Sequence, residues 1–364
     1  MNILITNRIL ARRSGTEVVV RDLSLALKKR GHHPMIYSPA PGRTAEESRH
    51  DGIEVYSDIR EIDRVPDVIH GHHHPQTLIA LLRFPDTPAI FVCHDAVAWH
   101  DDPLVFPRVL RYVAVDNRCK RRFERKAEIR PESIRLVLNA VDLSRFTPRP
   151  PLPAQPRRAV IFSNYASRWT HVPAIQKACS LLNIPCDVIG REYGTAVSRP
   201  ENILPKYDLV FAKARCALEA MAVGCAVVVC DFGGLGQMVR PQTFTELRAL
   251  NFGGGVLTRP LDPELIANEI RKYDADEAKL VSDRIRSEAD LTCAVDEWLE
   301  IYQEAVSEHA AAGSCREQEL AALADYMSEW GYDARIAWEK KRIAAALDWP
   351  LIGTWLRLWH RKLQ

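Results

Sequence analysis

The sequence predicts an α/β protein made of two Rossmann-like halves, each built on a parallel sheet. Two observations support this fold class. Short apolar runs alternate with helical patterns through most of the 364 residues, as they do where crossover helices join parallel strands. A proline-rich linker, residues 147–158 (TPRPPLPAQPRR), interrupts this alternation before it starts again. Open α/β sheets bind ligands where their strands end, so we expect a site in the cleft between the halves.

The N-terminal half, residues 1–146, has six apolar runs that predict strands. They lie at residues 2–6, 34–38, 67–70, 89–93, 112–115 and 135–138. The first helix is expected near residues 17–30, because Val19, Leu23 and Leu27 recur at helical spacing before Gly31.

The C-terminal half, residues 159–310, repeats the pattern. Its predicted strands lie at residues 159–163, 187–189, 208–211 and 226–230. Leu218–Val223 is helical in pattern and is expected to end at Gly224. Residues 231–236 carry three glycines and are expected to form a turn after the last strand. Such a turn, followed by a helix N-terminus, lets backbone N–H groups approach a phosphate.

Composition agrees with two globular domains and excludes a membrane-spanning protein. Hydrophobic residues make up 47% of the chain, enough for two cores, yet no run of 18 apolar residues occurs. The nine cysteines are odd in number, and several lie in apolar strands, as Cys93 and Cys230 do. They indicate reduced core thiols in a cytoplasmic protein. Met1 leads directly into a strand, so no signal peptide is expected.

Residues 218–239, LEAMAVGCAVVVCDFGGLGQMV, resemble the donor-site signature of family 4 glycosyltransferases, which are retaining enzymes with the GT-B fold. Three other segments resemble that family in the same order: Ser14–Gly31, Phe91–Asp95 (FVCHD) and Leu138–Phe146 (LNAVDLSRF). The resemblance covers residues 1 to about 310. It implies an acceptor domain at residues 1–146 and a nucleotide-sugar donor domain at residues 159–310, with their sheets facing across a cleft.

The donor segment departs from the family pattern in several places. The family's second glutamate is replaced, since Phe211 stands eight positions before Glu219, and Gln237 occupies a position where glutamate is commoner. The loop before Glu219 is short, as it is in family 28 glycosyltransferases and sugar-nucleotide 2-epimerases, which share the GT-B fold. Ser163–His171 (SNYASRWTH) stands where the family has its diphosphate segment.

The resemblance implies a donor site around Glu219, whose carboxylate would accept the ribose hydroxyls. The groups expected near the diphosphate are Lys213, Arg215, Gly233, Gly234, Leu235 and Gly236. Gly15 and Thr16 would let a diphosphate or acceptor approach the first helix. His94 would lie near the transferred sugar, and Arg168 would replace the family's basic pair. Each of these assignments has a structural alternative. Gly15 can belong to an ordinary βα loop, His94 can be a structural histidine, and Lys213 and Arg215 can be solvated loop charges.

We expect neither a metal nor a cofactor. The histidines of residues 70–75 (HGHHHP) cannot all face one ion from a strand, and no acidic triad accompanies them. We interpret the segment as a loop that follows the third strand and lines the acceptor side of the cleft. By resemblance, a UDP- or GDP-linked sugar would be the donor, and its leaving diphosphate would deprotonate the acceptor.

The predicted function is glycosyl transfer to a glycan or lipid-linked acceptor, as in polysaccharide biosynthesis. Two alternatives remain: a sugar-nucleotide epimerase of the same fold, and a non-catalytic protein that binds nucleotide sugars or glycans. The missing partner of Glu219 counts against the epimerase, which needs acids to move a proton at the sugar.

Two segments suggest that this cytoplasmic protein binds peripherally to anionic lipid at the inner face of the membrane. Residues 118–130 hold seven basic and two acidic residues, a net charge of +5. The helical tail, residues 311–364, holds five of the eight tryptophans, including Trp355 and Trp359 beside Arg357. The alternatives are a solvated helix face and a tail that packs on the N-terminal domain. Nucleic acid is not expected, because no nucleic-acid-binding fold accompanies the basic residues.

Overall fold

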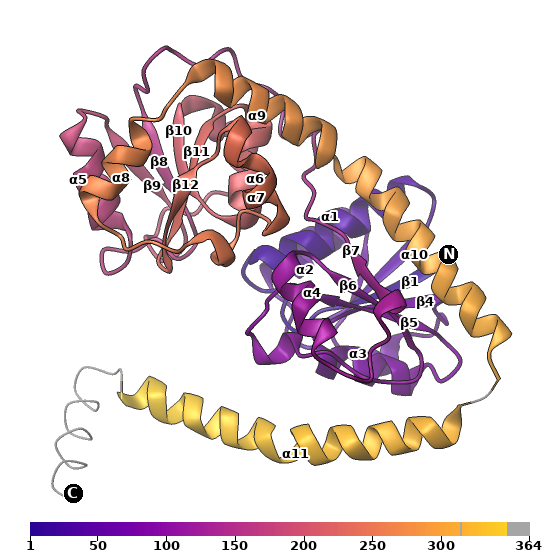
Figure 1. Cartoon of the computed structure of the whole chain (residues 1–364). Coiled ribbons are helices and arrows are strands. Elements are labelled where there is room, and N and C mark those ends of the chain that lie inside the picture. Colours follow the sequence, from indigo (N-terminus) through magenta and orange to yellow (C-terminus); the bar gives the residue numbers. More distant parts are fainter. Residues whose placement is uncertain (314, 348–364) are drawn as a thin grey trace, which may run out of the picture. The chain divides into compact units, whose positions relative to one another are not determined.

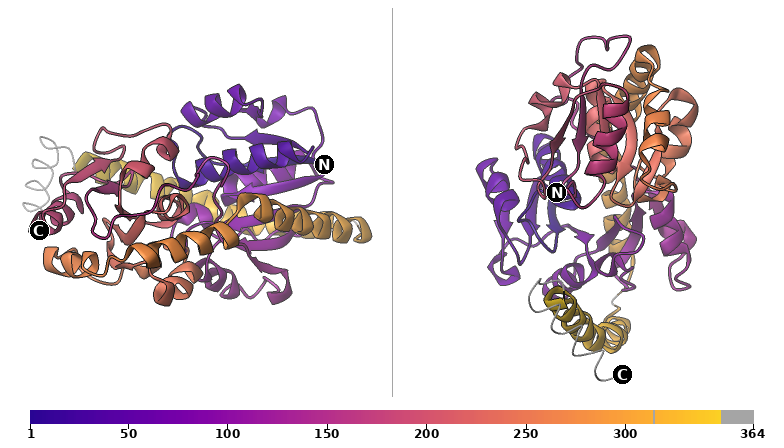
Figure 2. Two further views of the ribbon diagram at one scale, coloured as in Figure 1. Left: turned by 90° about the horizontal axis from the view of Figure 1, so that it is seen from above. Right: turned by 90° about the vertical axis from the view of Figure 1, so that its left-hand side faces the viewer.

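The computed structural model describes residues 1–313 and 315–347. Residues 1–104 and 108–311 form one compact unit, and residues 105–107 belong with the chain from Ala312 onward. The first unit contains two sheets flanked by helices (Figures 1 and 2), which confirms the predicted α/β class. The predictions for Trp355 and Trp359 lie outside the described residues.

The N-terminal sheet has seven parallel strands in the order β3-β2-β1-β4-β5-β6-β7. Their bounds are β1 (Asn2–Thr6), β2 (His33–Tyr37), β3 (Glu54–Tyr56), β4 (Val68–His72), β5 (Ala89–Cys93), β6 (Val109–Ala114) and β7 (Ile134–Leu136). The sequence predicted all but β3, whose three residues are too few to show alternation. The strand order reverses between β1 and β4, and in open α/β sheets ligands bind where strands end at such a point.

The helices of the N-terminal half are α1 (Gly15–Lys29), α2 (Arg43–His50), α3 (His74–Arg83) and α4 (Asn117–Glu124). Helix α1 begins at Gly15, two residues earlier than predicted, and buries Val20, Leu23 and Leu27. Val19 is only half-buried. Leu23 and Leu27 are therefore buried as predicted, whereas Val20 is buried in place of Val19.

The C-terminal sheet has five strands in the order β12-β11-β10-β8-β9, with β12 antiparallel to β11. Their bounds are β8 (Ala159–Phe162), β9 (Cys186–Ile189), β10 (Leu209–Ala212), β11 (Ala226–Asp231) and β12 (Gly234–Met238). Every residue of β10 and β11 is buried, as expected for central strands covered on both faces. The strand order reverses between β8 and β10, so a ligand is expected to bind near the loops that follow these two strands.

The expected turn after β11 is present but is confined to Phe232 and Gly233, and the expectation of a helix directly after it is wrong. Gly234 and Gly236 lie in β12, and the next helix begins only at Pro241. A Cβ atom at Gly234 would lie 2.8 Å from the carbonyl oxygen of Arg259, and one at Gly236 would lie 2.9 Å from that of Val229. Close backbone packing therefore requires these glycines. Their expected proximity to a phosphate stays a prediction.

The helices of the C-terminal half are α5 (Val172–Leu181), α6 (Ala214–Val223), α7 (Pro241–Ala249), α8 (Pro263–Ile270), α9 (Ala275–Glu288) and α10 (Leu291–Ala311). Helix α6 ends at Gly224, as predicted, and this glycine has a left-handed φ of 99°. Helix α10 returns to the N-terminal sheet, where the Tyr302 hydroxyl lies 2.6 Å from Nδ1 of His70. Helix α11 (Arg316–Leu347) belongs to the second unit. None of the described helices could span a bilayer.

Candidate functional site

Two cavities lie at the strand ends and share the loop before α1. The larger, here the His94 cavity, has a volume of about 720 Å³; its wall includes Arg8, Arg12, Gly15, Thr16, His73, His94, Asp101 and Tyr165. The smaller, here the Glu219 cavity, has a volume of about 300 Å³; its wall includes Arg12, Gly15, Phe162, Asn164, Val197, Pro200, Arg215 and Glu219. Residues of both halves therefore line each cavity.

One buried carboxylate, that of Glu17, organises the shared loop. One of its oxygens accepts the backbone N–H of Arg12 at 2.7 Å and that of Arg13 at 3.1 Å. Its other oxygen accepts the Ser14 hydroxyl at 2.8 Å. Gly15 is left exposed at the start of α1, with no atom within 4 Å of the place a Cβ would occupy. The sequence analysis missed Glu17, although Ser14 and Glu17 have capping-box spacing.

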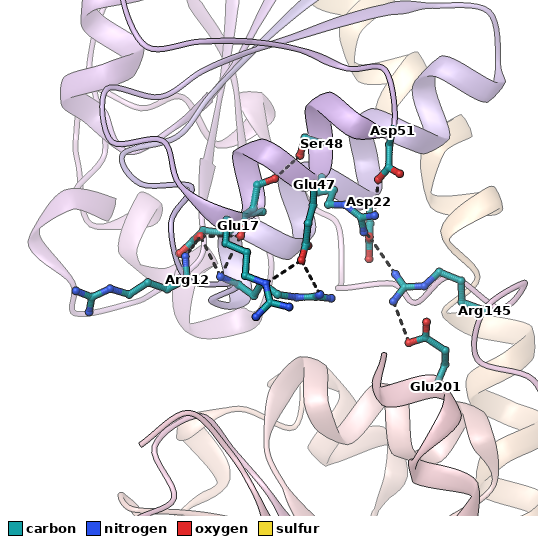
Figure 3. A network of polar contacts seen from close by, with 12 residues as sticks. Arg12, Glu17, Asp22, Glu47, Ser48, Asp51, Arg145 and Glu201 are labelled. Atoms are coloured by element: carbon teal, nitrogen blue, oxygen red, sulfur yellow. Dashed lines mark hydrogen bonds and ion pairs between the residues drawn. The ribbon is translucent and has the colours of Figure 1, made fainter. Parts of the chain in front are cut away.

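Glu219 is buried in α6 and is paired with an arginine one turn earlier. Its Oε1 atom lies 2.9 Å from Nε of Arg215, and Arg215 also pairs with Asp22 of α1. Asp22 accepts a second bond from Arg145 at 3.3 Å, and Arg145 pairs with Glu201 at 3.1 Å (Figure 3). Burial raises the pKa of Glu219, and Arg215 opposes this shift. The charge of Arg215 is thus already offset by two carboxylates.

Lys213 and Arg168 have contrasting surroundings. Lys213 pairs with buried Asp231 at 2.7 Å. Its ammonium nitrogen also lies 5.3 Å from the ring centre of Tyr165 and 4.9 Å from that of Phe232. Arg168 is exposed and, within the described ranges, makes no ion pair. Neither residue belongs to the wall of the His94 cavity or of the Glu219 cavity.

His94 follows β5 directly and contacts a second histidine. Its Nε2 atom lies 2.7 Å from Nδ1 of His72, the last residue of β4. Burial lowers the pKa of His94 to about 4 and that of His72 well below its usual value. Both rings are therefore neutral at pH 7. The sequence analysis did not predict that His72 contacts His94. This contact depends on the register between β4 and β5, which neither segment shows by itself.

The interpretation of residues 70–75 as a loop is wrong. His70 and His72 are buried in β4, and α3 begins at His74. His73 alone lies between these elements, with a left-handed φ of 66°. It is the one histidine of the segment in the wall of the His94 cavity. The strand is longer than predicted because buried histidines continue it past the apolar residues.

The structure brings His73 together with His100 and Asp101, two residues that the sequence analysis did not consider. Their potential ligand atoms all lie within 4.8 Å of one another. However, Nδ1 of His73 accepts the backbone N–H of Arg8 at 3.1 Å. The neutral ring then carries its proton on Nε2, which faces Asp101 at 3.9 Å. A protonated nitrogen has no lone pair for a metal, so this tautomer disfavours metal binding by His73.

Comparison with family models connects the N-terminal half to known enzymes. Residues 13–145, which include Glu17, Asp22, His72 and His94, match the model described as Glycosyltransferase Family 4. The N-terminal half is therefore similar to family 4 glycosyltransferases.

Solved structures of glycosyltransferases with the GT-B fold show that the chain shares this fold. A glycosyltransferase from Rickettsia africae ESF-5 has a TM-score of 0.62 at 16% identity, covering 84% of this chain and 98% of its own. Alr3699/HepE of Anabaena, solved with UDP and glucose, has a TM-score of 0.63 at 14% identity, with coverages of 84% and 100%. Sucrose-phosphate synthase of Thermosynechococcus elongatus has a TM-score of 0.61 at 12% identity, with coverages of 86% and 100%. No curated protein matched the sequence.

The structure brings some of the predicted site residues together at the two cavities and leaves others apart. Gly15, Thr16 and His94 line the His94 cavity, while Gly15, Arg215 and Glu219 line the Glu219 cavity. The remaining predicted residues line neither of these two cavities: Arg168, Lys213, Gly233, Gly234, Leu235 and Gly236. The catalytic and binding roles of all these residues stay predictions.

Proposed function

We propose that the protein transfers a sugar from a UDP- or GDP-linked donor to a glycan or lipid-linked acceptor, with retention and without a metal or cofactor. The observation that carries this proposal is the Glu219 cavity, in which the acid of α6 meets the loop before α1. The match to glycosyltransferase family 4 supports this chemistry. A related fold that was solved with UDP and glucose supports a nucleotide-sugar donor.

The Glu219 cavity has groups suited to a nucleoside. One oxygen of Glu219 is held by Arg215, which leaves the other to accept ribose hydroxyls. Phe162, Val197 and Pro200 supply apolar wall next to it, against which a nucleobase can pack. The nucleotide would therefore lie mainly on the C-terminal half, with its diphosphate directed toward the loop that contains Gly15.

The acceptor would occupy the His94 cavity, because this cavity shares the loop before α1 with the proposed donor site. In the proposed retaining reaction, the leaving diphosphate removes the acceptor proton on the face from which it departs. Arg168, Lys213 or Arg215 would offset its charge. Of these three, Lys213 and Arg215 already hold buried carboxylates, whereas exposed Arg168 can turn toward an arriving anion.

Turnover of nucleotide sugars in excess EDTA tests this proposal. Donors that raise the melting temperature are selected first and are then incubated with and without mixed glycan and lipid-linked acceptors. We expect acceptor-dependent release of nucleoside diphosphate that persists in EDTA, with the anomeric configuration of the donor kept in the product. Activity that is lost in EDTA and returns with Mn²⁺ or Mg²⁺ would contradict the metal-free mechanism.

The same experiment separates the alternatives. A structure described as a putative UDP-N-acetylglucosamine 2-epimerase from Listeria monocytogenes shares the fold, with a TM-score of 0.52 at 13% identity. An epimerase would change the sugar of the donor in the absence of any acceptor. A non-catalytic protein would bind the nucleotide sugar and leave it intact. The proposed transferase would release nucleoside diphosphate from the donor only when an acceptor is present.

We also propose that the protein is cytoplasmic and attaches peripherally to an anionic membrane surface. The basic segment of residues 118–130 supports this only in part, because several of its charges are offset. Arg122 and Lys126 pair with Asp102 at 3.0 and 3.3 Å. Arg121 and Arg125 are exposed, and within the described part of the chain neither forms an ion pair. These two residues would contact the lipid phosphates in the proposed attachment.

A further inference from the structure

The contact between His72 and His94 fixes which ring nitrogen of His94 is used inside the protein. His72 ends β4 and His94 follows β5, and these strands are parallel neighbours with His72 opposite Val92. Both side chains therefore emerge at the same edge of the sheet. The ring centres are 4.8 Å apart, with 28° between the ring planes. Since Nε2 of His94 is engaged with His72, its Nδ1 is the nitrogen left for a ligand.

The contact requires one proton between the two nitrogens. Nε2 of His94 and Nδ1 of His72 lie 2.7 Å apart, so one must donate and the other must accept. Two arrangements of the neutral rings satisfy this condition. Either His72 donates from Nδ1 and His94 keeps its own proton on Nδ1, or His94 donates from Nε2 and leaves Nδ1 as a lone pair.

The other nitrogen of His72 distinguishes these arrangements. Nε2 of His72 is buried, with less than 1 Å² of its surface accessible, and no described residue forms a hydrogen bond with it. If His94 donates, His72 must carry its proton on this Nε2 atom, which leaves an N–H group that neither protein nor water can reach. Buried N–H groups without an acceptor are rarer in proteins than under-satisfied acceptors. The first arrangement leaves only a bare lone pair there.

We propose that His72 is a positioning residue that holds His94 in the tautomer protonated at Nδ1. His94 then offers an N–H donor, and not a lone pair, to an oxygen atom of the ligand in the His94 cavity. This assignment rests on the proposed function only for the identity of that ligand. It also places base catalysis elsewhere, since neutral His94 has no lone pair left to accept a proton from a substrate.

Nitrogen-15 NMR of the ligand-free, histidine-labelled protein tests the tautomer directly, whatever reaction the protein catalyses. Spectra of His94→Gln and His72→Asn assign the two rings. At pH 7, Nδ1 of His94 should have a protonated, pyrrole-type shift, and its Nε2 should have a pyridine-type shift. The reverse pattern for His94, or a doubly protonated ring, would overturn the proposal.

Two substitutions test whether His72 is the cause. His72→Asn keeps an amide N–H close to the position of Nδ1 and should preserve the His94 tautomer, whereas His72→Phe removes the donor and should change it. His70→Phe is the matched control, because His70 is equally buried in β4 but bonds to Tyr302. An unchanged His94 tautomer in folded His72→Phe would refute the role of His72.

Kinetics then link the tautomer to the proposed transfer. With a donor found by the turnover screen, His72→Phe should lower kcat about tenfold or more while KM for the donor changes little, the pattern expected when a transition-state hydrogen bond is lost. His72→Asn should recover most of that kcat. If the tautomer shifts but kcat does not, the NMR result still stands and His94 does not act in the rate-limiting step.

Discussion

Removing the negative charge of Glu219 without changing its shape should weaken nucleotide binding about tenfold. A hydrogen bond to a charged group contributes about 1.5–3 kcal/mol and one between neutral groups about 0.5–1.5 kcal/mol. The difference of roughly 1.4 kcal/mol corresponds to a factor of about ten in Kd. In Glu219→Gln, the side-chain carbonyl can still accept the Arg215 bond of 2.9 Å, and Asp22 still pairs with Arg215. The ion network should therefore survive.

Isothermal titration with UDP and with 2′-deoxy-UDP measures this effect and locates it on the ribose. Wild-type protein should bind UDP more tightly than the deoxy analogue, and Glu219→Gln should lose most of that preference. GDP and its deoxy analogue replace this pair if UDP does not bind. Glu246→Gln is the matched control, since Glu246 is an exposed acid on α7. Its Kd values should equal those of wild type.

Two results would refute the reasoning about Glu219. The first is an unchanged Kd for UDP in a Glu219→Gln protein whose melting temperature matches that of wild type. The second is an equal loss of affinity for both nucleotides, which would mean that the carboxylate acts on the diphosphate or on the fold and not on the ribose hydroxyls.

Three further predictions follow from single features of the structure. Gly15→Ala should keep the melting temperature, because nothing lies within 4 Å of the added Cβ, yet it should weaken nucleotide or acceptor binding; unchanged binding would make the loop purely structural. Burial raises the pKa of Asp101 to about 7, so its protonated form favours the folded state, and this stabilisation is lost as pH rises from about 4 through 7. The free energy of unfolding of Asp101→Asn should therefore exceed that of wild type by roughly 4 kcal/mol at pH 8 but not at pH 4, measured by urea unfolding; a gain independent of pH would contradict this. Liposomes with anionic lipid should bind the protein at low salt and release it as salt rises, and deletion of residues 349–364 should weaken binding; indifference to such liposomes would favour a packing role for the tail.

The accuracy of the sequence analysis depended on how local each signal was. Strand β11 and the end of α6 at Gly224 were predicted because a buried apolar run and a left-handed glycine are properties of a few adjacent residues. Strand β12 was missed because its sequence, GLGQM, has the glycines of a turn. Those glycines are needed for contacts with Val229 and Arg259, which lie outside the segment.

The candidate site shows the same division. Gly15, His94 and Glu219 were predicted from short motifs, and each lines a cavity. Asp22 was not predicted, since Arg215, its partner, lies 193 residues away in the sequence. The pairing of Arg215 could not be predicted either, because a cation in a loop pattern gives no sign of which carboxylates will surround it.

The sequence by itself determined the α/β class, most strand positions and the resemblance to family 4 glycosyltransferases, because periodicity and short motifs depend on neighbouring residues. Only the tertiary structure decided which charges are paired and which nitrogen of His94 contacts His72. Hydrogen-bond partners and burial arise where separate segments meet: β4 beside β5, and α1 beside α6. The chemistry of the site is therefore set by contacts that no single stretch of the chain contains.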